Sequence, residues 1–171
     1  MKKVLLIISL FLTGCESHSD KAYSDIYLTT TGEKIGEILF TDTSQGLNIK
    51  VNLQNLPQGE HGFHIHENPN CEAAVNKDGK SEPALSAGGH YDPENTGKHL
   101  GPNNPQGHKG DLPYLTVDKK GEAKTSFYMP NLKVKEVKNH SIMIHADEDN
   151  YKDTPKPLGG GGARIACGII K

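Results

Sequence analysis

The sequence lacks tryptophan, is poor in aromatic residues and has no apolar run long enough to cross a membrane. Aromatic side chains make up 6% of its 171 residues. The mean hydropathy is negative, which excludes an integral membrane protein. The formal net charge of −2 gives no basic footprint for nucleic acid. A chain of this length can bury one real core, so we expect a single folded domain.

Glycine and histidine are abundant instead. The chain has 19 glycines, 10 prolines and nine histidines. The glycines and prolines favour short elements joined by turns, and the histidine count is the first indication of a metal. His64 and His66 lie two residues apart, so on a strand they face one side while Phe63 and Ile65 face the core. This segment alone fits either half of a transition-metal site or two surface histidines on an amphipathic strand.

The N-terminus has the pattern of an export signal. Lys2 and Lys3 precede an apolar segment, Val4 to Leu12, that is too short to span a bilayer. Leu12-Thr13-Gly14-Cys15 resembles the lipobox of bacterial lipoproteins. This resemblance implies cleavage before Cys15, lipidation of its thiol and, from Glu16, sorting to the outer membrane, facing the periplasm. The alternative is an ordinary secretory signal with a chance cysteine. We expect a signal peptide over 1–14, a flexible tether over 15–24 and the domain over 25–171.

The remaining cysteines are Cys71 and Cys167. Two thiols in an exported domain favour one disulfide over two free buried cysteines. His18 lies in the tether and is not expected to bind metal.

The domain has a β pattern with two long irregular segments. Residues 67–112 and 147–162 are rich in glycine, proline and acidic or amide residues. Loops of this length in one domain indicate function rather than an error of assignment. Segment 130–139 is expected to be a connection with some strand character. We expect eight short strands and no helix, forming an all-β, eight-stranded Greek-key β-sandwich or flattened barrel. The strands are expected over 26–30, 35–40, 47–53, 62–66, 114–117, 123–128, 141–145 and 164–170.

Several ordered motifs resemble the copper/zinc superoxide dismutase family in its bacterial exported form. They are Gly62-Phe63-His64-Ile65-His66, Gly88-Gly89-His90-Tyr91-Asp92-Pro93, His108-Lys109-Gly110-Asp111, His145 and Gly162-Ala163-Arg164-Ile165-Ala166-Cys167-Gly168. The resemblance implies one copper ion on His64, His66, His90 and His145, and one zinc ion on His90, His99, His108 and Asp111. His90 would bridge the two metals. Imidazole suits both oxidation states of copper, and three imidazoles with one carboxylate suit zinc.

Two further residues follow from the same resemblance. Asp149 would link a copper histidine to a zinc histidine, although a solvated acid in the acidic run Asp147-Glu148-Asp149 is the competing interpretation. Arg164 would hold superoxide beside copper, reached through the glycines at 159–162, and the alternative is an exposed arginine at a strand end. His61 and His140 are out of phase with the metal histidines, so we expect structural roles for both.

The resemblance implies dismutation of superoxide to oxygen and hydrogen peroxide at a copper centre that cycles between Cu(II) and Cu(I). His90 and Arg164 would be the catalytic residues, and the protein would protect the cell envelope as a monomer or homodimer. A surface lipoprotein that stores or delivers copper and zinc without useful turnover is the alternative, and adhesion is a third. The net charge does not favour an anionic substrate, so local cations must attract it. The candidates are Lys109, Lys152, Lys156 and Arg164.

Overall fold

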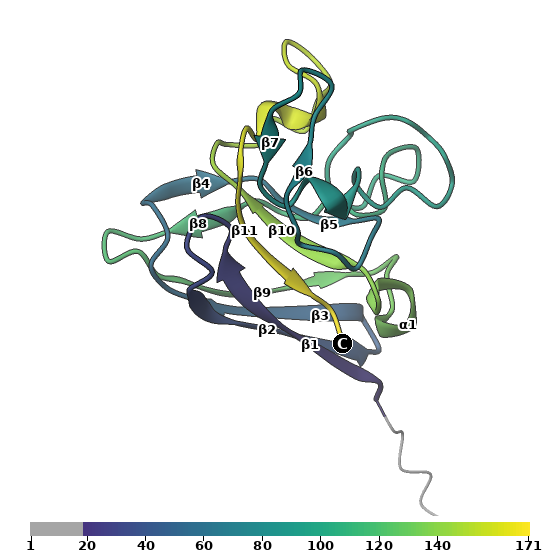
Figure 1. Ribbon diagram of the computed structural model, residues 1–171. Coiled ribbons are helices and arrows are strands. Elements are labelled where there is room, and N and C mark those ends of the chain that lie inside the picture. The colour runs from purple at the N-terminus through teal and green to yellow at the C-terminus, as the bar shows by residue number, and fades with distance from the viewer. Residues whose placement is uncertain (1–18) are drawn as a thin grey trace, which may run out of the picture.

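The computed structural model describes residues 19–171 (Figure 1). Cys15, His18, the expected signal peptide and the first part of the expected tether lie outside the described residues. None of the described helices is long and apolar enough to cross a membrane.

One curled antiparallel sheet forms most of the domain. Its strand order is β5-β10-β11-β1-β2-β3-β9. These strands are β1 (Lys21–Leu28), β2 (Lys34–Thr43), β3 (Gly46–Leu53), β5 (Phe63–His66), β9 (Ala123–Met129), β10 (Ser141–His145) and β11 (Arg164–Ile169). Phe63 on one edge strand contacts Phe127 on the other, with ring centroids 6.1 Å apart and the rings nearly perpendicular. The sheet is therefore rolled so far that its two edges share one core (Figure 1).

The core lies inside this roll because the strands alternate. On β2 and β3 the side chains of Ile38, Phe40, Ile49 and Val51 are buried, while the intervening residues face outward. Each fully buried side chain of this size contributes about 1.5–3 kcal/mol. The all-β class and the curled architecture agree with the sequence analysis.

The strand count differs from the expected eight. Eleven strands are present in the described chain, because short pairs form at the rim of the sheet. An additional short strand, β4 (Gly59–His61), precedes the histidine strand β5 and pairs with β8 (Leu115–Val117). Inside the long segment 67–112, β6 (Ala74–Val75) and β7 (Ser81–Glu82) form a hairpin before the 3₁₀ turn η1 (Leu85–Ala87). Strands this short show no hydrophobic alternation in the sequence, so they could not be predicted from it.

Two boundaries also differ. The first strand begins at Lys21, inside the segment expected to be tether, because β1 pairs with β2 from Lys21 opposite Thr41 onward. The prediction of strand character in 130–139 was wrong, since this segment contains the helix α1 (Val134–Val137). Val134 and Val137 share its buried face, and Asp42 accepts a hydrogen bond from the Val134 N–H at 2.9 Å. A second 3₁₀ turn, η2 (Leu158–Gly160), lies in the other long loop.

Candidate metal centre

Strands β5 and β10 place three imidazoles on the face of the sheet opposite the core. Phe63 and Ile65 point into the core, yet His64 and His66 are also at most 1% exposed. The neighbouring β10 contributes His145, after a break in the pairing register between Ile144 and His145. The His145 ring lies 4.9 Å from His64 and 5.6 Å from His66, measured between ring centroids. Because every strand residue here is buried, the long loops must cover this face.

The loop 67–112 brings His90 to this group. His90 and His66 form an isolated β-bridge, which fixes the loop backbone beside β5. The His90 ring stacks on His64 at 4.0 Å and lies 5.0 Å from His66. One ring nitrogen from each of these four histidines lies within 4.8 Å of the others, and all four residues are buried. These are the four residues that the sequence assigned to copper.

A second buried group adjoins the first. It consists of His64, His90, His99 and Asp111, whose donor atoms also lie within 4.8 Å of one another. The sequence assigned His108 to this set in the place that His64 takes here. His108 stands at its edge, 8% exposed, with Nδ1 3.5 Å from Oδ1 of Asp111. Asp111 contacts all three expected histidine partners, because its carboxylate also lies 2.9 Å from Nδ1 of His90 and of His99.

Three nitrogens of these groups are buried without a hydrogen-bond partner. They are the Nδ1 atoms of His64, His99 and His108. Those of His99 and His108 lie close to the Asp111 carboxylate, but they do not point at it with hydrogen-bond geometry. Buried polar atoms are almost always paired, so lone pairs converging on one carboxylate fit cation ligands. The donor set therefore fits copper and zinc.

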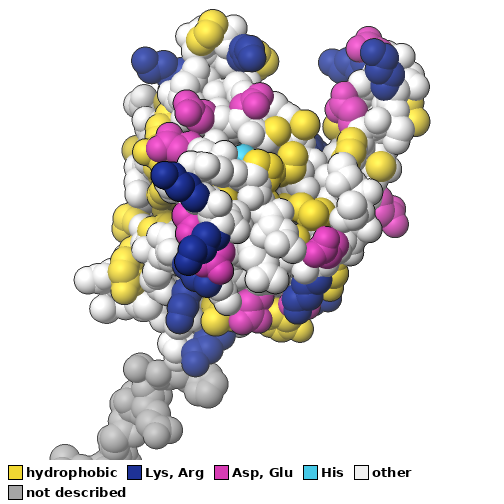
Figure 2. All heavy atoms as spheres, turned by 90° about the vertical axis from the view of Figure 1, so that its left-hand side faces the viewer, with side chains coloured by type: hydrophobic (Ala, Val, Ile, Leu, Met, Phe, Trp, Pro, Cys, Tyr) yellow, Lys and Arg dark blue, Asp and Glu magenta, His cyan; other side chains and the backbone are white. Residues whose placement is uncertain are grey.

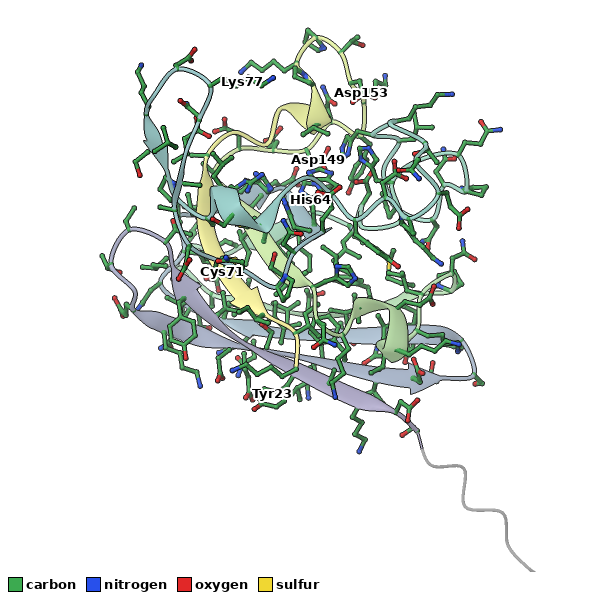
Figure 3. All side chains as sticks on the ribbon, turned by 45° about the vertical axis from the view of Figure 1, so that its right-hand side comes forward. Tyr23, His64, Cys71, Lys77, Asp149 and Asp153 are labelled. Carbon is green, nitrogen blue, oxygen red and sulfur yellow. A yellow bond between two sulfur atoms is a disulfide. The ribbon has the colours of Figure 1, made fainter. Side chains whose placement is uncertain are left out.

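Asp149 connects the two groups by contacting the Nε2 atoms of His64 and His99. Its Oδ2 lies 2.6 Å from Nε2 of His64, and its Oδ1 lies 2.7 Å from Nε2 of His99 (Figure 3). The Tyr151 N–H donates to the same Oδ1 at 2.8 Å. The competing interpretation of Asp149 as a solvated acid is excluded, since the residue is 7% exposed. A carboxylate on the outer nitrogen of a ligand fixes the ring orientation and leaves the other nitrogen for metal.

The charges of these groups suit a bound cation. Burial, and then the neighbouring His64, lower the pKa of His90 to about 3. Burial also holds the pKa of His66 and of His145 well below the ordinary value. At neutral pH these rings are neutral and keep their lone pairs. Burial alone would raise the pKa of Asp149, but hydrogen bonds from His64 and His99 outweigh it and lower that pKa. The carboxylate is therefore ionised.

Arg164 is held at the edge of the first group. Its Nη1 donates to the Ala84 carbonyl at 2.6 Å and its Nη2 to the Gly88 carbonyl at 2.7 Å. The Gly88 carbonyl also lies 3.0 Å from Nδ1 of His66. The guanidinium and an imidazole of the first group therefore share one backbone acceptor. Arg164 is not a free strand-end arginine.

The disulfide Cys71–Cys167 is present, with a sequence separation of 96 residues. It ties β11, the strand of Arg164, to the loop that carries Ala84 and Gly88. This bond and the two guanidinium contacts fix one wall of the site.

Comparison with known proteins agrees with this geometry. The family model for copper/zinc superoxide dismutase (SODC) matches residues 34–170. A superoxide dismutase [Cu-Zn] of Escherichia coli (strain K12) is 47% identical over 170 residues, which cover 98% of this chain and 97% of the relative. This chain belongs to the copper/zinc superoxide dismutase family.

Solved structures give the same result for the fold. The Cu/Zn superoxide dismutase from Brucella abortus superposes with a TM-score of 0.84 at 47% identity, covering 89% of this chain and all of that one. The monomeric copper, zinc superoxide dismutase from Salmonella enterica gives 0.74 at 49% identity, covering 90% and 100%. The enzyme is thus a superoxide dismutase with one copper and one zinc ion as its cofactors.

The glycines at 159–162 have a closer role in this dismutase than the sequence analysis gave them. Gly159 has φ of 71°, and a Cβ there would lie 1.9 Å from Oδ1 of Asp149 and 2.7 Å from Nε2 of His99. A Cβ on Gly161 would lie 3.2 Å from that of His145. Gly159 and Gly161 therefore pack directly against the site, and nothing in the sequence pairs them with their contacts.

The two excluded histidines of the enzyme hold the backbone around the site. The ring nitrogens of His61 lie 2.8 Å from the His145 carbonyl and 2.9 Å from the Pro57 carbonyl. Nδ1 of His140 lies 3.1 Å from the His66 carbonyl, and its ring packs on Tyr91. Both structural roles agree with the prediction.

The centre of the dismutase lies at the base of a hollow. Figure 2 shows two raised lobes, each carrying lysine or arginine as well as acidic side chains, and a histidine side chain at the foot of one of them. Figure 3 shows Lys77 of the β6–β7 hairpin and Asp153 of the 147–162 loop at the same end of the molecule as His64. Of the candidate cations, Lys152 and Lys156 are exposed in that loop, whereas Lys109 forms an ion pair with Glu136 of α1. Lys109 is therefore engaged away from the hollow.

Proposed function

We propose that this enzyme removes superoxide in a bacterial cell envelope, converting two superoxide ions and two protons to oxygen and hydrogen peroxide. His64, His66, His90 and His145 would hold copper, and His90, His99, His108 and Asp111 would hold zinc. When bound, copper supplies one-electron chemistry between Cu(II) and Cu(I), and zinc supplies a fixed positive charge.

The observation that carries this proposal is the position of His90 between the two groups. Both His64 and His90 belong to both groups. Nε2 of His64 is taken by Asp149, so His64 has only Nδ1 left for a metal. His90 has Nδ1 beside Asp111 and leaves Nε2 for the first group. His90 is therefore the imidazole suited to serve two ions.

The chain's own residues would bind the anion and supply protons. Arg164 offers a cation fixed by two backbone acceptors, so it can bind superoxide without first being ordered. Nδ1 of His90 lies beside Asp111, so the Nε2 atom of His90 is the one that can carry a proton to the departing peroxide. Asp149 would keep the rings of His64 and His99 in position while this occurs.

Metal analysis together with a superoxide-consumption assay tests the proposal. We expect about one copper and one zinc per chain, loss of superoxide consumption after chelation and recovery on adding back copper. A protein that holds both metals and does not consume superoxide would contradict it and favour the alternative of copper and zinc storage or delivery. Arg164 argues against storage, because a metal reservoir needs no anchored guanidinium beside the site.

The subcellular localisation of the enzyme is a separate proposal. We infer export by the signal 1–14, lipidation at Cys15 and an outer-membrane location facing the periplasm, with the domain as a monomer or homodimer. The monomeric relative from Salmonella enterica supports the monomer. Mass spectrometry of the mature protein is expected to find Cys15 as the first residue, bearing lipid. A mature N-terminus elsewhere, or lipid that persists in Cys15→Ser, would contradict this proposal.

A further inference from the structure

The end of the domain where the chain enters carries a group of lysines that no part of the metal centre uses. Asp20 precedes β1, and its carbonyl accepts the Asp42 N–H, while Asp42 accepts the Val134 N–H of α1. The last residue, Lys171, pairs its backbone with Tyr23. These contacts place β1, α1 and the last residue side by side. We call the exposed or half-exposed lysines of these segments the lysine patch, and they are Lys21, Lys133, Lys135, Lys138 and Lys171.

The charge of the patch is opposite to that of the rest of the domain. Asp20 and Asp42 lie among its five lysines, and nearby Glu136 is neutralised by its ion pair with Lys109. The sequence as a whole is slightly acidic. Figure 2 shows Lys and Arg side chains, with acidic ones between them, beside the junction with the grey residues on the face of the domain away from α1. Positive charge is thus concentrated at one end of an acidic protein.

Exposed aromatic side chains adjoin the patch on the outer face of the sheet. Tyr23 is 46% exposed and Tyr128 is 49% exposed. The register places Lys21, Thr41, Asn48 and Tyr128 in one row across β1, β2, β3 and β9. Tyrosine beside lysine is the composition that a membrane–water interface favours, since the ring has an apolar body and a polar tip.

A lipid anchor on Cys15 would bring this end of the domain close to a membrane. If Cys15 carries lipid, as proposed above, five residues lie between the anchor and Lys21, and the six Cα–Cα steps from Cys15 to Lys21 can span at most about 20 Å. A polybasic patch beside a lipid anchor is attracted to anionic headgroups once it lies within about 10 Å of them. We propose that the lysine patch docks on the anionic phospholipid surface in which Cys15 is anchored.

Docking at this end would orient the enzyme. The entering chain, α1 and the last residue lie at one end of the domain, and β6, β7 and η2 lie at the other (Figure 1). Tyr23 is likewise far from His64 and Asp149 (Figure 3). The hollow above the metal centre therefore faces away from the lipid, toward the aqueous space from which superoxide diffuses.

Lysine footprinting of the mature lipidated protein in vesicles tests the proposal. Vesicles of phosphatidylcholine alone are compared with vesicles that also contain phosphatidylglycerol, and acylation of each lysine is followed by mass spectrometry. We expect labelling of Lys21, Lys133 and Lys138 to slow about fivefold in the anionic vesicles. Lys77 and Lys80, at the other end, should be unaffected, and 0.5 M salt should abolish the difference.

Two charge-reversal variants, one in the patch and one outside it, make the test specific. In K133E/K135E/K138E, the protection of Lys21 and Lys171 should disappear. In the matched control K77E/K80E/K119E it should persist. Equal labelling in the two kinds of vesicle, or protection that appears only with lipopolysaccharide, would overturn docking on phospholipid. Failure of the protein to float with phosphatidylcholine vesicles would instead overturn the anchor and docking together. Neither outcome depends on dismutase activity.

Discussion

Gly159 packs so closely against Asp149 that a Cβ atom on the glycine would lie 1.9 Å from Oδ1 of that carboxylate. The same turn contains Gly160, whose φ of 76° is nearly the same, but a Cβ there would approach only Lys156, at 3.6 Å. These two glycines separate the effect of backbone strain from the effect of a contact with the metal centre.

Gly159→Ala is expected to weaken metal binding, whereas Gly160→Ala is not. Both alanines bear a similar strain of about 1–3 kcal/mol from a positive φ. Only Gly159→Ala displaces the carboxylate that holds His64 and His99, and losing such a partner typically lowers metal affinity about 10–100-fold. Competition with a chromogenic chelator measures the affinity. Equal losses in the two variants would show that the contact with Asp149 is unimportant.

Asp149→Asn tests the carboxylate itself. Each oxygen of Asp149 now contacts one imidazole nitrogen, at 2.6 Å and 2.7 Å. An amide keeps one acceptor and turns its NH₂ toward the other ring, so one histidine loses its fixed orientation. We expect about a 10–100-fold loss of metal affinity. The neighbouring acid Glu148 is exposed, and Glu148→Gln is the matched control with no expected effect.

Arg164→Ala should leave the metal content intact and slow superoxide consumption. A hydrogen bond to a charged partner is worth about 1.5–3 kcal/mol, so the rate should fall about 10–100-fold. Arg164→Lys keeps the charge but cannot reach both Ala84 and Gly88, and we expect an intermediate rate. Pulse radiolysis measures the rate, and metal analysis is the control. An unchanged rate in the alanine variant would remove Arg164 from the mechanism.

The disulfide is expected to stabilise the domain and to hold the wall of Arg164. The bond closes a long loop, so removing it through Cys71→Ser with Cys167→Ser should lower the free energy of unfolding by about 3–5 kcal/mol. Denaturant unfolding of the metal-loaded protein measures this loss. Activity per bound copper should also fall, because the loop with Ala84 and Gly88 is no longer tied to β11. Full activity would mean that the guanidinium contacts alone suffice.

Exposed lysines of the 147–162 loop are expected to attract the substrate. Neutralising Lys152 and Lys156 to glutamine should reduce the rate at low ionic strength and have little effect at high salt, where their field is screened. Lys109→Gln is the matched control, since Lys109 is paired with Glu136. The measurement is the superoxide rate as a function of salt. A salt-independent loss would indicate damage to the site rather than lost attraction.

The residues named from the sequence as metal ligands lie together in the structure, but only the structure shows which of them are nearest to one another. His64 and His66 face one side because a strand has a period of two, and this could be predicted from five residues. The grouping of His64 with His99 and Asp111, and the position of His108 at the edge, depend on how the loop 67–112 folds. That loop has no hydrophobic period, so its path could not be predicted from local pattern.

The sequence by itself determined the β class, the histidine pair on a strand, the pairing of Cys71 with Cys167 and the family, because alternation, cysteine number and motif order are properties of the linear chain. Only the tertiary structure decided that α1 replaces a connection, that Asp149 reaches both His64 and His99, and that Gly159 must lack a side chain. These depend on contacts between segments far apart in the chain, which no local period encodes. The lysine patch is of the same kind, since its lysines come from residues 21, 133–138 and 171 and become one surface only when β1, α1 and the end of the chain lie together.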